Sequence, residues 1–324
     1  MLTKTQRALM AALKLAITAG LLYYLLSGVD LSRLQKIVTT VSPATMVVAI
    51  ALHVISYGVG GLRWWLLANN AGLALPFRAV LPSYYLGIFF NNFLPTGVGG
   101  DVVRILHLRR PRVSLRSLIA STVSDRLIGF IVVFATGLFS LAALEHVLLD
   151  DSTRVILFSL ALMAIVSIWI FATDWFETLI ARLTHRYRHT RVLKSILEIV
   201  TTLHGLRNRR GLIVGAVGLS LLIQSLIILC YYFLALGIGL NQPLLLFFAI
   251  IPVVIIATNI PISIGGLGVR EGALVSLLVL SGTPPDAALG LSLVYLAVFW
   301  CASLPGLAVM MLLSTRRQHT DTSA

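Results

Sequence analysis

The sequence predicts an all-α polytopic membrane protein with about eight hydrophobic segments, six of them spans and two broken, re-entrant segments, in two halves of inverted topology. Composition is the first reason: 58% of the 324 residues are hydrophobic, 11% are charged, and the mean hydropathy is +0.95, outside the range of soluble domains. The placement of the basic residues is the second reason, because they gather in a few loops. The third is that two apolar segments contain Pro, a Gly pair and charges.

Apolar segments of membrane length follow one another from the N-terminus. We expect them near 9–27, 43–66, 79–103, 117–143, 154–172, 211–236, 243–281 and 286–313. The first follows basic residues as a signal peptide would, but its apolar run reaches Leu26 without a clear cleavage site, so we expect an anchor helix.

One membrane domain accounts for nearly the whole chain. We expect it over 1–316, with inverted halves 1–143 and 154–313, an amphipathic cytoplasmic connector at 174–210, and a short cytoplasmic tail at 317–324. A solvated connector that only enforces topology is an equal alternative for 174–210.

The positions of the basic residues predict the orientation. They crowd one loop from Arg104 to Arg116 and another from Arg182 to Arg210. By the positive-inside rule, both loops and both termini face the cytoplasm, and the protein lies in the cell (inner or plasma) membrane. If 79–103 crossed the membrane fully, the first basic loop would lie outside. We therefore predict that 79–103 re-enters from the cytoplasmic side and, by the same argument, 243–281 from the outer side.

The two broken segments also resemble each other in sequence. "NNFLPTGVGGDVVR" contains Asn92, Pro95, Gly99, Gly100 and Arg104, and "NIPISIGGLGVR" contains Asn259, Pro261, Gly265, Gly266 and Arg270 in the same order. Paired broken segments in inverted halves are typical of transport sites near the bilayer midplane, because freed backbone groups persist there only beside protein or water. We expect the Pro and Gly residues to act as hinges.

Charged residues within membrane segments are costly and are functional candidates by default. The predicted substrate-binding residues are Asp101, Arg104, Asp125, Arg126, Arg270 and Glu271, with Asn92 and Asn259. An Arg after a half-helix start suits an anionic headgroup. Alternatives remain: Asp101 and Arg104 as ordinary boundary charges, and Asp125–Arg126 as a structural ion pair.

Enzyme signatures are missing from the sequence. It contains no P-loop, HExxH, nucleophile elbow or Cys/His metal spacing, and Cys230 and Cys301 stand in apolar stretches. We therefore expect no catalytic residue, metal or cofactor. The net charge of +13 arises beside apolar segments, which favours membrane lipids over nucleic acid as the partner.

Four stretches, "NNFLPTGVGGDVVR", "SDRLIG", "PISIGGLGVREGAL" and "GTPPDAALGLSLVY", resemble the flippase-like membrane domain of lysylphosphatidylglycerol synthases. The resemblance implies a lipid flippase with two inverted halves meeting at a central cavity, and a site on Arg104, Asp125–Arg126 and Arg270–Glu271. Asp125 stands where the family usually has Glu, and Leu296 where many members have Arg. With no soluble transferase domain in the 324 residues, we expect no lipid aminoacylation.

These observations together predict a protein that moves an anionic or glycosylated lipid between leaflets by alternating exposure of a central cavity. The first alternative is an intramembrane enzyme acting on a lipid headgroup, with Asp125, Glu271 or His53 as a base. The second is a non-catalytic subunit that scaffolds a lipid-biosynthesis enzyme as its partner. The sequence leaves the oligomeric state open.

Overall fold

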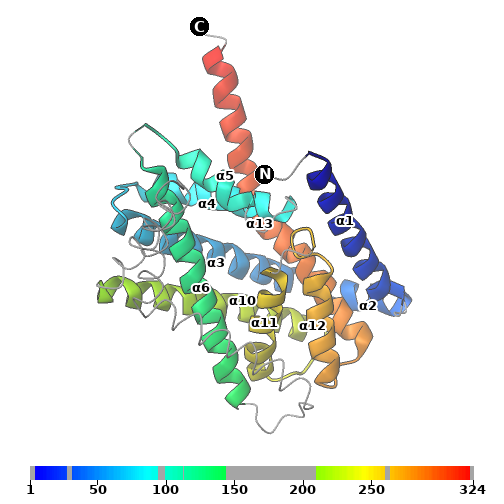
Figure 1. The fold of residues 1–324 in the computed structure, drawn as a ribbon. Helices are drawn as coiled ribbons and strands as arrows, with labels where there is room; N and C mark the ends of the chain where they lie inside the picture. Colours follow the sequence, from blue (N-terminus) through cyan, green and yellow to red (C-terminus); the bar gives the residue numbers. More distant parts are fainter. Residues whose placement is uncertain are drawn as a thin grey trace, which may run out of the picture.

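The computed structural model describes residues 4–27, 31–93, 99–111, 113–143, 209–259 and 263–321, and it contains no strand within those ranges (Figure 1). Their helices are α1 (Lys4–Ser27), α2 (Leu31–Thr40), α3 (Pro43–Asn70), α4 (Phe77–Phe93), α5 (Gly99–Leu108), α6 (Leu115–Ala143), α10 (Arg210–Gly237), α11 (Leu244–Asn259), α12 (Val269–Leu280) and α13 (Pro285–Asp321). The predicted all-α fold is confirmed.

Four of the described helices are long and apolar enough to cross a membrane: Pro43–Asn70, Leu115–Phe139, Arg210–Gly237 and Pro285–Leu313. They coincide with four of the predicted spans, and α1 covers the predicted first segment, so the chain is a multi-pass membrane protein. The predicted span 154–172 and the connector up to residue 208 lie outside the described residues. Helices α3 and α13 run on past the predicted apolar limits. In α13 the added residues include Arg and Gln, which continue a helix readily beyond the hydrocarbon.

Both interrupted segments divide into two shorter helices. The first becomes α4 and α5, of 17 and 10 residues, and the second becomes α11 and α12, of 16 and 12 residues. None of the four matches the roughly 20 residues that a bilayer crossing requires. In each pair the two arms pack against each other (Figure 1). The interruptions themselves, with Pro95 and Pro261, lie outside the described residues.

Two glycines bring the backbones of α4 and α5 into contact. A Cβ atom on Gly100 would lie 1.8 Å from the carbonyl oxygen of Gly87, and one on Gly87 would lie 2.8 Å from the carbonyl oxygen of Gly100. Asn91 completes the crossing, since its Oδ1 accepts a hydrogen bond from the Gly100 backbone N–H at 2.7 Å. The side chain of Asn91 on α4 therefore caps the first turn of α5.

The second Gly pair has a different conformation from the first. Gly265 and Gly266 form a turn ahead of α12 with φ values of +58° and +76°, which favour glycine, whereas Gly99 and Gly100 are the first residues of α5. A Cβ on Gly265 would lie 2.8 Å from the carbonyl oxygen of Asn92 at the end of α4. The two broken segments therefore meet.

Two hydrophobic clusters surround these contacts. One joins α3 to α4, α5 and the start of α6 and includes the fully buried Trp64 and Leu118. The larger draws mainly on α10 to α13, and Tyr231 and Tyr295 stack there with ring centroids 3.7 Å apart. Helix α1 begins and α13 ends on the same side of the molecule (Figure 1).

Replacing Gly100 with alanine tests the close crossing of α4 and α5. We expect Gly100→Ala to lower the free energy of unfolding in detergent by about 3 kcal/mol, as overpacking against a rigid backbone does. Gly215→Ala on α10 is the matched control, because a Cβ there has no atom within 4 Å, and it should leave stability unchanged or raise it by up to about 1 kcal/mol. Equal melting temperatures for the two variants would contradict the crossing.

Candidate functional site

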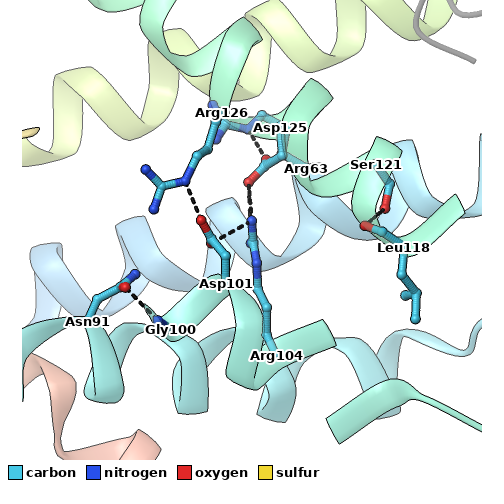
Figure 2. Close-up of polar contacts among 9 residues, drawn as sticks. All are labelled: Arg63, Asn91, Gly100, Asp101, Arg104, Leu118, Ser121, Asp125 and Arg126. Atoms are coloured by element: carbon cyan, nitrogen blue, oxygen red, sulfur yellow. Dashed lines mark hydrogen bonds and ion pairs between the residues drawn. The ribbon is translucent and has the colours of Figure 1, made fainter. Parts of the chain in front are cut away.

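Five charged side chains from α3, α5 and α6 form one connected group (Figure 2). Asp125 accepts from Arg63 Nε at 2.7 Å through Oδ1, and its Oδ2 lies 3.4 Å from Arg104. Asp101 in turn pairs with Arg104 at 3.0 Å and with Arg126. The order is Arg63, Asp125, Arg104, Asp101, Arg126, so each carboxylate stands between two guanidinium groups. We call these five residues the charge chain.

Most of the charge chain is buried. Arg63, Asp101, Arg104 and Asp125 are each 7% exposed or less, so their charges depend on one another and on polar neighbours rather than on water. Arg63 gains a further partner in Ser220 of α10, whose Oγ accepts from the guanidinium at 2.7 Å. The chain thus ties α3, α5 and α6 to α10.

Small and aromatic residues make room for the buried arginines. A Cβ on Gly129 of α6 would lie 3.2 Å from a terminal nitrogen of Arg63, so glycine at this position lets the guanidinium lie against the helix. The guanidinium of Arg104 lies over the rings of Trp64 at 4.3 Å and Tyr84 at 5.2 Å, where the π faces partly replace water. Its Nε has no hydrogen-bond partner.

A cavity of about 330 Å³ opens at the charge chain. All five members line it, together with polar groups from α3, α4, α10 and α11 that include Ser56, Tyr57, Asn91, Gln224 and Asn259. The remaining wall is apolar and comes mainly from α6, α10 and α11, with Phe130, Val133, Ile223, Ile227 and Ile255. A molecule in this cavity meets both charged groups and apolar side chains.

The structure brings five predicted site residues to this cavity: Asp101, Arg104, Asp125, Arg126 and Asn259. Asp101 and Arg104 are buried partners on successive turns of α5, so they are not boundary charges in water. Asp125 makes its ion pairs to Arg63 and Arg104 on other helices, so the structural alternative for Asp125 and Arg126 takes the form of ion pairs between helices.

Arg270 and Glu271 lie in a separate buried cluster and do not line the cavity. Arg270 donates to Glu271 Oε1 at 2.7 Å and lies over the ring of Phe299 at 4.3 Å. Glu271 Oε2 accepts from the Gly268 backbone N–H at 2.5 Å, at the start of α12. Asn92 is also absent from the cavity wall and instead contacts the turn at Gly265.

Side chains already bind one backbone N–H at the start of each of the two half-helices. The Gly100 N–H at the start of α5 is bonded to Asn91, and the Gly268 N–H before α12 is bonded to Glu271. The cavity itself offers guanidinium and amide side chains as donors for an anion.

Sequence reasoning missed Arg63, Ser220 and Gln224. Arg63 had a usable signal, because it is a charge inside the predicted segment 43–66. Ser220 and Gln224 stand four residues apart on one face of α10, but neutral polar residues in an apolar helix are too common to single out. No group of three or more His, Cys, Asp or Glu residues among the described positions is arranged to hold a metal ion.

Comparison with known sequences shows which proteins this chain is similar to. The sequence model of the lysylphosphatidylglycerol synthase TM region matches residues 11–306. A protein of Methanothermobacter thermautotrophicus named UPF0104 membrane protein is 24% identical over 292 residues, which cover 83% of this chain and 85% of that protein. A second UPF0104 membrane protein, from Methanocaldococcus jannaschii, is 21% identical over 283 residues, with coverage of 83% and 84%.

A double-mutant cycle tests whether the charge chain acts as a unit. Asp125→Asn leaves the buried Arg63 and Arg104 without their shared carboxylate, and we expect it to lower the free energy of unfolding by about 3–5 kcal/mol. Arg63→Gln should cost a similar amount because it strips Asp125 of its closest partner. The double variant should be less destabilised than the sum of the two, by about 2 kcal/mol. Strict additivity in detergent unfolding would contradict the pairing.

Proposed function

The chain belongs to the lysylphosphatidylglycerol synthase transmembrane family, and we propose that it moves an anionic or glycosylated lipid between the two leaflets of the cell membrane. The observation that carries the proposal is the charge chain at a cavity that is also lined by apolar side chains. An amphiphile needs both: charged donors for its headgroup and hydrocarbon for the chain segments next to it.

The size of the cavity supports transport of the headgroup with the acyl chains left in the bilayer. About 330 Å³ is near the lower limit of small-molecule sites, which is enough for a headgroup but too small for a whole lipid. The costly step of flipping is the passage of the polar headgroup through hydrocarbon. A buried polar cavity lowers that cost by substituting protein donors for water.

The mechanism that we propose is alternating exposure of the cavity to the two leaflets. The arms α4–α5 and α11–α12 meet at Asn92 and Gly265, so a change at one break is transmitted directly to the other. The left-handed turn at Gly265 and Gly266 is a natural hinge. Arg104 holds the headgroup in the cavity, and Arg270 contributes in a state in which its cluster is open.

Lipid movement in proteoliposomes tests the proposal. Wild-type protein should carry fluorescent phosphatidylglycerol between leaflets faster than protein-free vesicles, measured by dithionite quenching of the outer leaflet. Arg104→Gln should slow this movement at least tenfold, since a hydrogen bond to a charged group is worth about 1.5–3 kcal/mol. Arg209→Gln is the matched control, because Arg209 is exposed and bonded to Asn70, and its rate should equal the wild-type rate.

The alternatives give different results in the same vesicles. A chemically altered lipid, detected by mass spectrometry after incubation with the purified protein, would favour an intramembrane enzyme. If wild-type protein moves no lipid, and Arg104→Gln leaves cells indistinguishable from wild type, the transport proposal fails and a scaffolding role is favoured.

Cysteine accessibility tests the proposed orientation. In a variant lacking Cys230 and Cys301, a cysteine replacing Ser281 after α12 should react with an impermeant thiol reagent in intact cells, and one replacing Ser114 before α6 should not. The start of α6 and the end of α12 lie at opposite ends of the view in Figure 1. Strong labelling at Ser114 would overturn the cytoplasmic placement of the basic loop and the re-entrant topology derived from it.

A further inference from the structure

We propose that the protein adopts a second conformation in which Arg270 on α12 donates a hydrogen bond to His53 on α3, and that this bond ties α12 to the wall of the cavity. The inference deepens the alternating exposure of the proposed function and rests on it for its role in transport. Three features carry it: two unpaired nitrogen atoms, an aromatic surface that both side chains share, and a link from His53 to the cavity.

Two buried nitrogen atoms around Arg270 have no hydrogen-bond partner. One is Nδ1 of His53, a residue that is 1% exposed, and the other is Nη1 of Arg270, which is 4% exposed. Buried polar groups are paired in nearly all folded proteins, and neither atom has accessible surface at which a bound molecule would reach it. Each therefore needs a partner from within the chain, which a movement of the helices can bring to it.

The guanidinium of Arg270 has one edge bound and one end free. Its Nε and Nη2 both donate to Oε1 of Glu271, at 3.0 and 2.7 Å, so Nη1 remains as the available donor. A hydrogen bond from Nη1 to another acceptor does not require the ion pair to break. Arg270 can therefore keep its compensating carboxylate while α12 moves.

His53 and Arg270 lie against the same two rings of α13. The imidazole centroid is 5.5 Å from the ring of Tyr295 and 5.9 Å from that of Phe299. The guanidinium carbon of Arg270 is 5.5 Å and 4.3 Å from the same two centroids. A guanidinium that moves along this surface towards the imidazole keeps aromatic contact, and the left-handed glycine turn ahead of α12 is the hinge for such a movement.

Tyr57 connects His53 to the cavity. Its hydroxyl lies 3.0 Å from His53 Nε2, and Tyr57 lines the cavity. A neutral imidazole carries one N–H, and buried N–H groups without a partner are rarer than buried acceptors without one. The proton is therefore assigned to Nε2, which donates to the Tyr57 oxygen. Nδ1 is then an acceptor, which is what the free donor of Arg270 requires.

Substitutions of His53 separate the roles of its two nitrogen atoms. The amide of asparagine lies as many bonds from the backbone as Nδ1, and the amide of glutamine as many as Nε2. His53→Asn therefore keeps an acceptor for Arg270 and loses the bond to Tyr57. His53→Gln keeps the bond to Tyr57 and has no acceptor at the place of Nδ1, and His53→Phe keeps a ring without either nitrogen.

The measurement is the distance between spin labels on α3 and α12, determined by pulsed electron–electron double resonance in vesicles of phosphatidylcholine and phosphatidylglycerol. Cysteines replacing the exposed Ala44 and Leu280 carry the labels, in a background that lacks Cys230 and Cys301. With His53 present we expect two distances, of which the shorter belongs to the second conformation. His53→Phe and His53→Gln should reduce the ratio of the shorter to the longer distance about tenfold, the effect of one hydrogen bond to a charged group, and His53→Asn should retain it.

Two further variants test the link to the cavity and the specificity of the effect. Tyr57→Phe removes the acceptor for Nε2–H, so it should lower the ratio when His53 is present and leave it unchanged in His53→Asn, whose side chain does not reach Tyr57. His107→Phe is the matched control, because His107 on α5 is bonded to Ser83 and lies outside the cluster around Arg270. It should give the same ratio as the parent protein.

The outcomes separate this inference from the proposed function. A single distance in the parent protein, or a ratio that His53→Asn lowers as far as His53→Phe does, would overturn the inference even if lipid moves between leaflets. If the ratios change as expected and the protein moves no lipid, the second conformation stands and the proposed function fails. Melting temperatures of the His53 variants within a few degrees of the parent establish that altered ratios reflect the equilibrium and not unfolding.

Discussion

The shared carboxylate of Asp125 is the constraint on which the rest of the site depends. Arg63 and Arg104 come from α3 and α5, and burying either guanidinium without a compensating anion would strongly destabilise the fold. Asp125 on α6 compensates both at once, so the positions of three helices are fixed relative to one carboxyl group. The cavity exists because these helices are held at their polar residues, with Ser220 extending the same network to α10.

The backbone contact between α4 and α5 makes that arrangement possible. Gly87 and Gly100 allow the two arms to approach closely, which side chains at either position would prevent. The approach places Asp101 and Arg104 on the inner face of α5, while Val102 and Leu106 face outwards and are about half exposed. This short helix thus buries its charges against protein and leaves an apolar face exposed.

The sequence was sufficient for the helical fold and for part of the site, for a physical reason. In a chain that is 58% hydrophobic, ionisable residues within apolar segments stand out, so Asp101, Arg104, Asp125 and Arg126 could be selected without a structure. Their partners could not be selected, because pairing depends on which helix faces which. Asp125 beside Arg126 suggested a local pair, but neighbours in a helix point about 100° apart, and each found its partner on another helix.

The two broken segments share a sequence pattern yet hold their arginines in different ways, and the difference limits how the protein can move. Arg104 pairs with carboxylates on α5 and α6, so any shift of α5 relative to α6 must break a buried ion pair. Arg270 pairs with its own neighbour Glu271, which also accepts from Gly268. The Arg270–Glu271 pair can therefore move together with α12 without breaking. Because the left-handed turn of Gly265 and Gly266 lies directly ahead of α12, a rearrangement costs least in electrostatic energy if α12 moves and α5 stays.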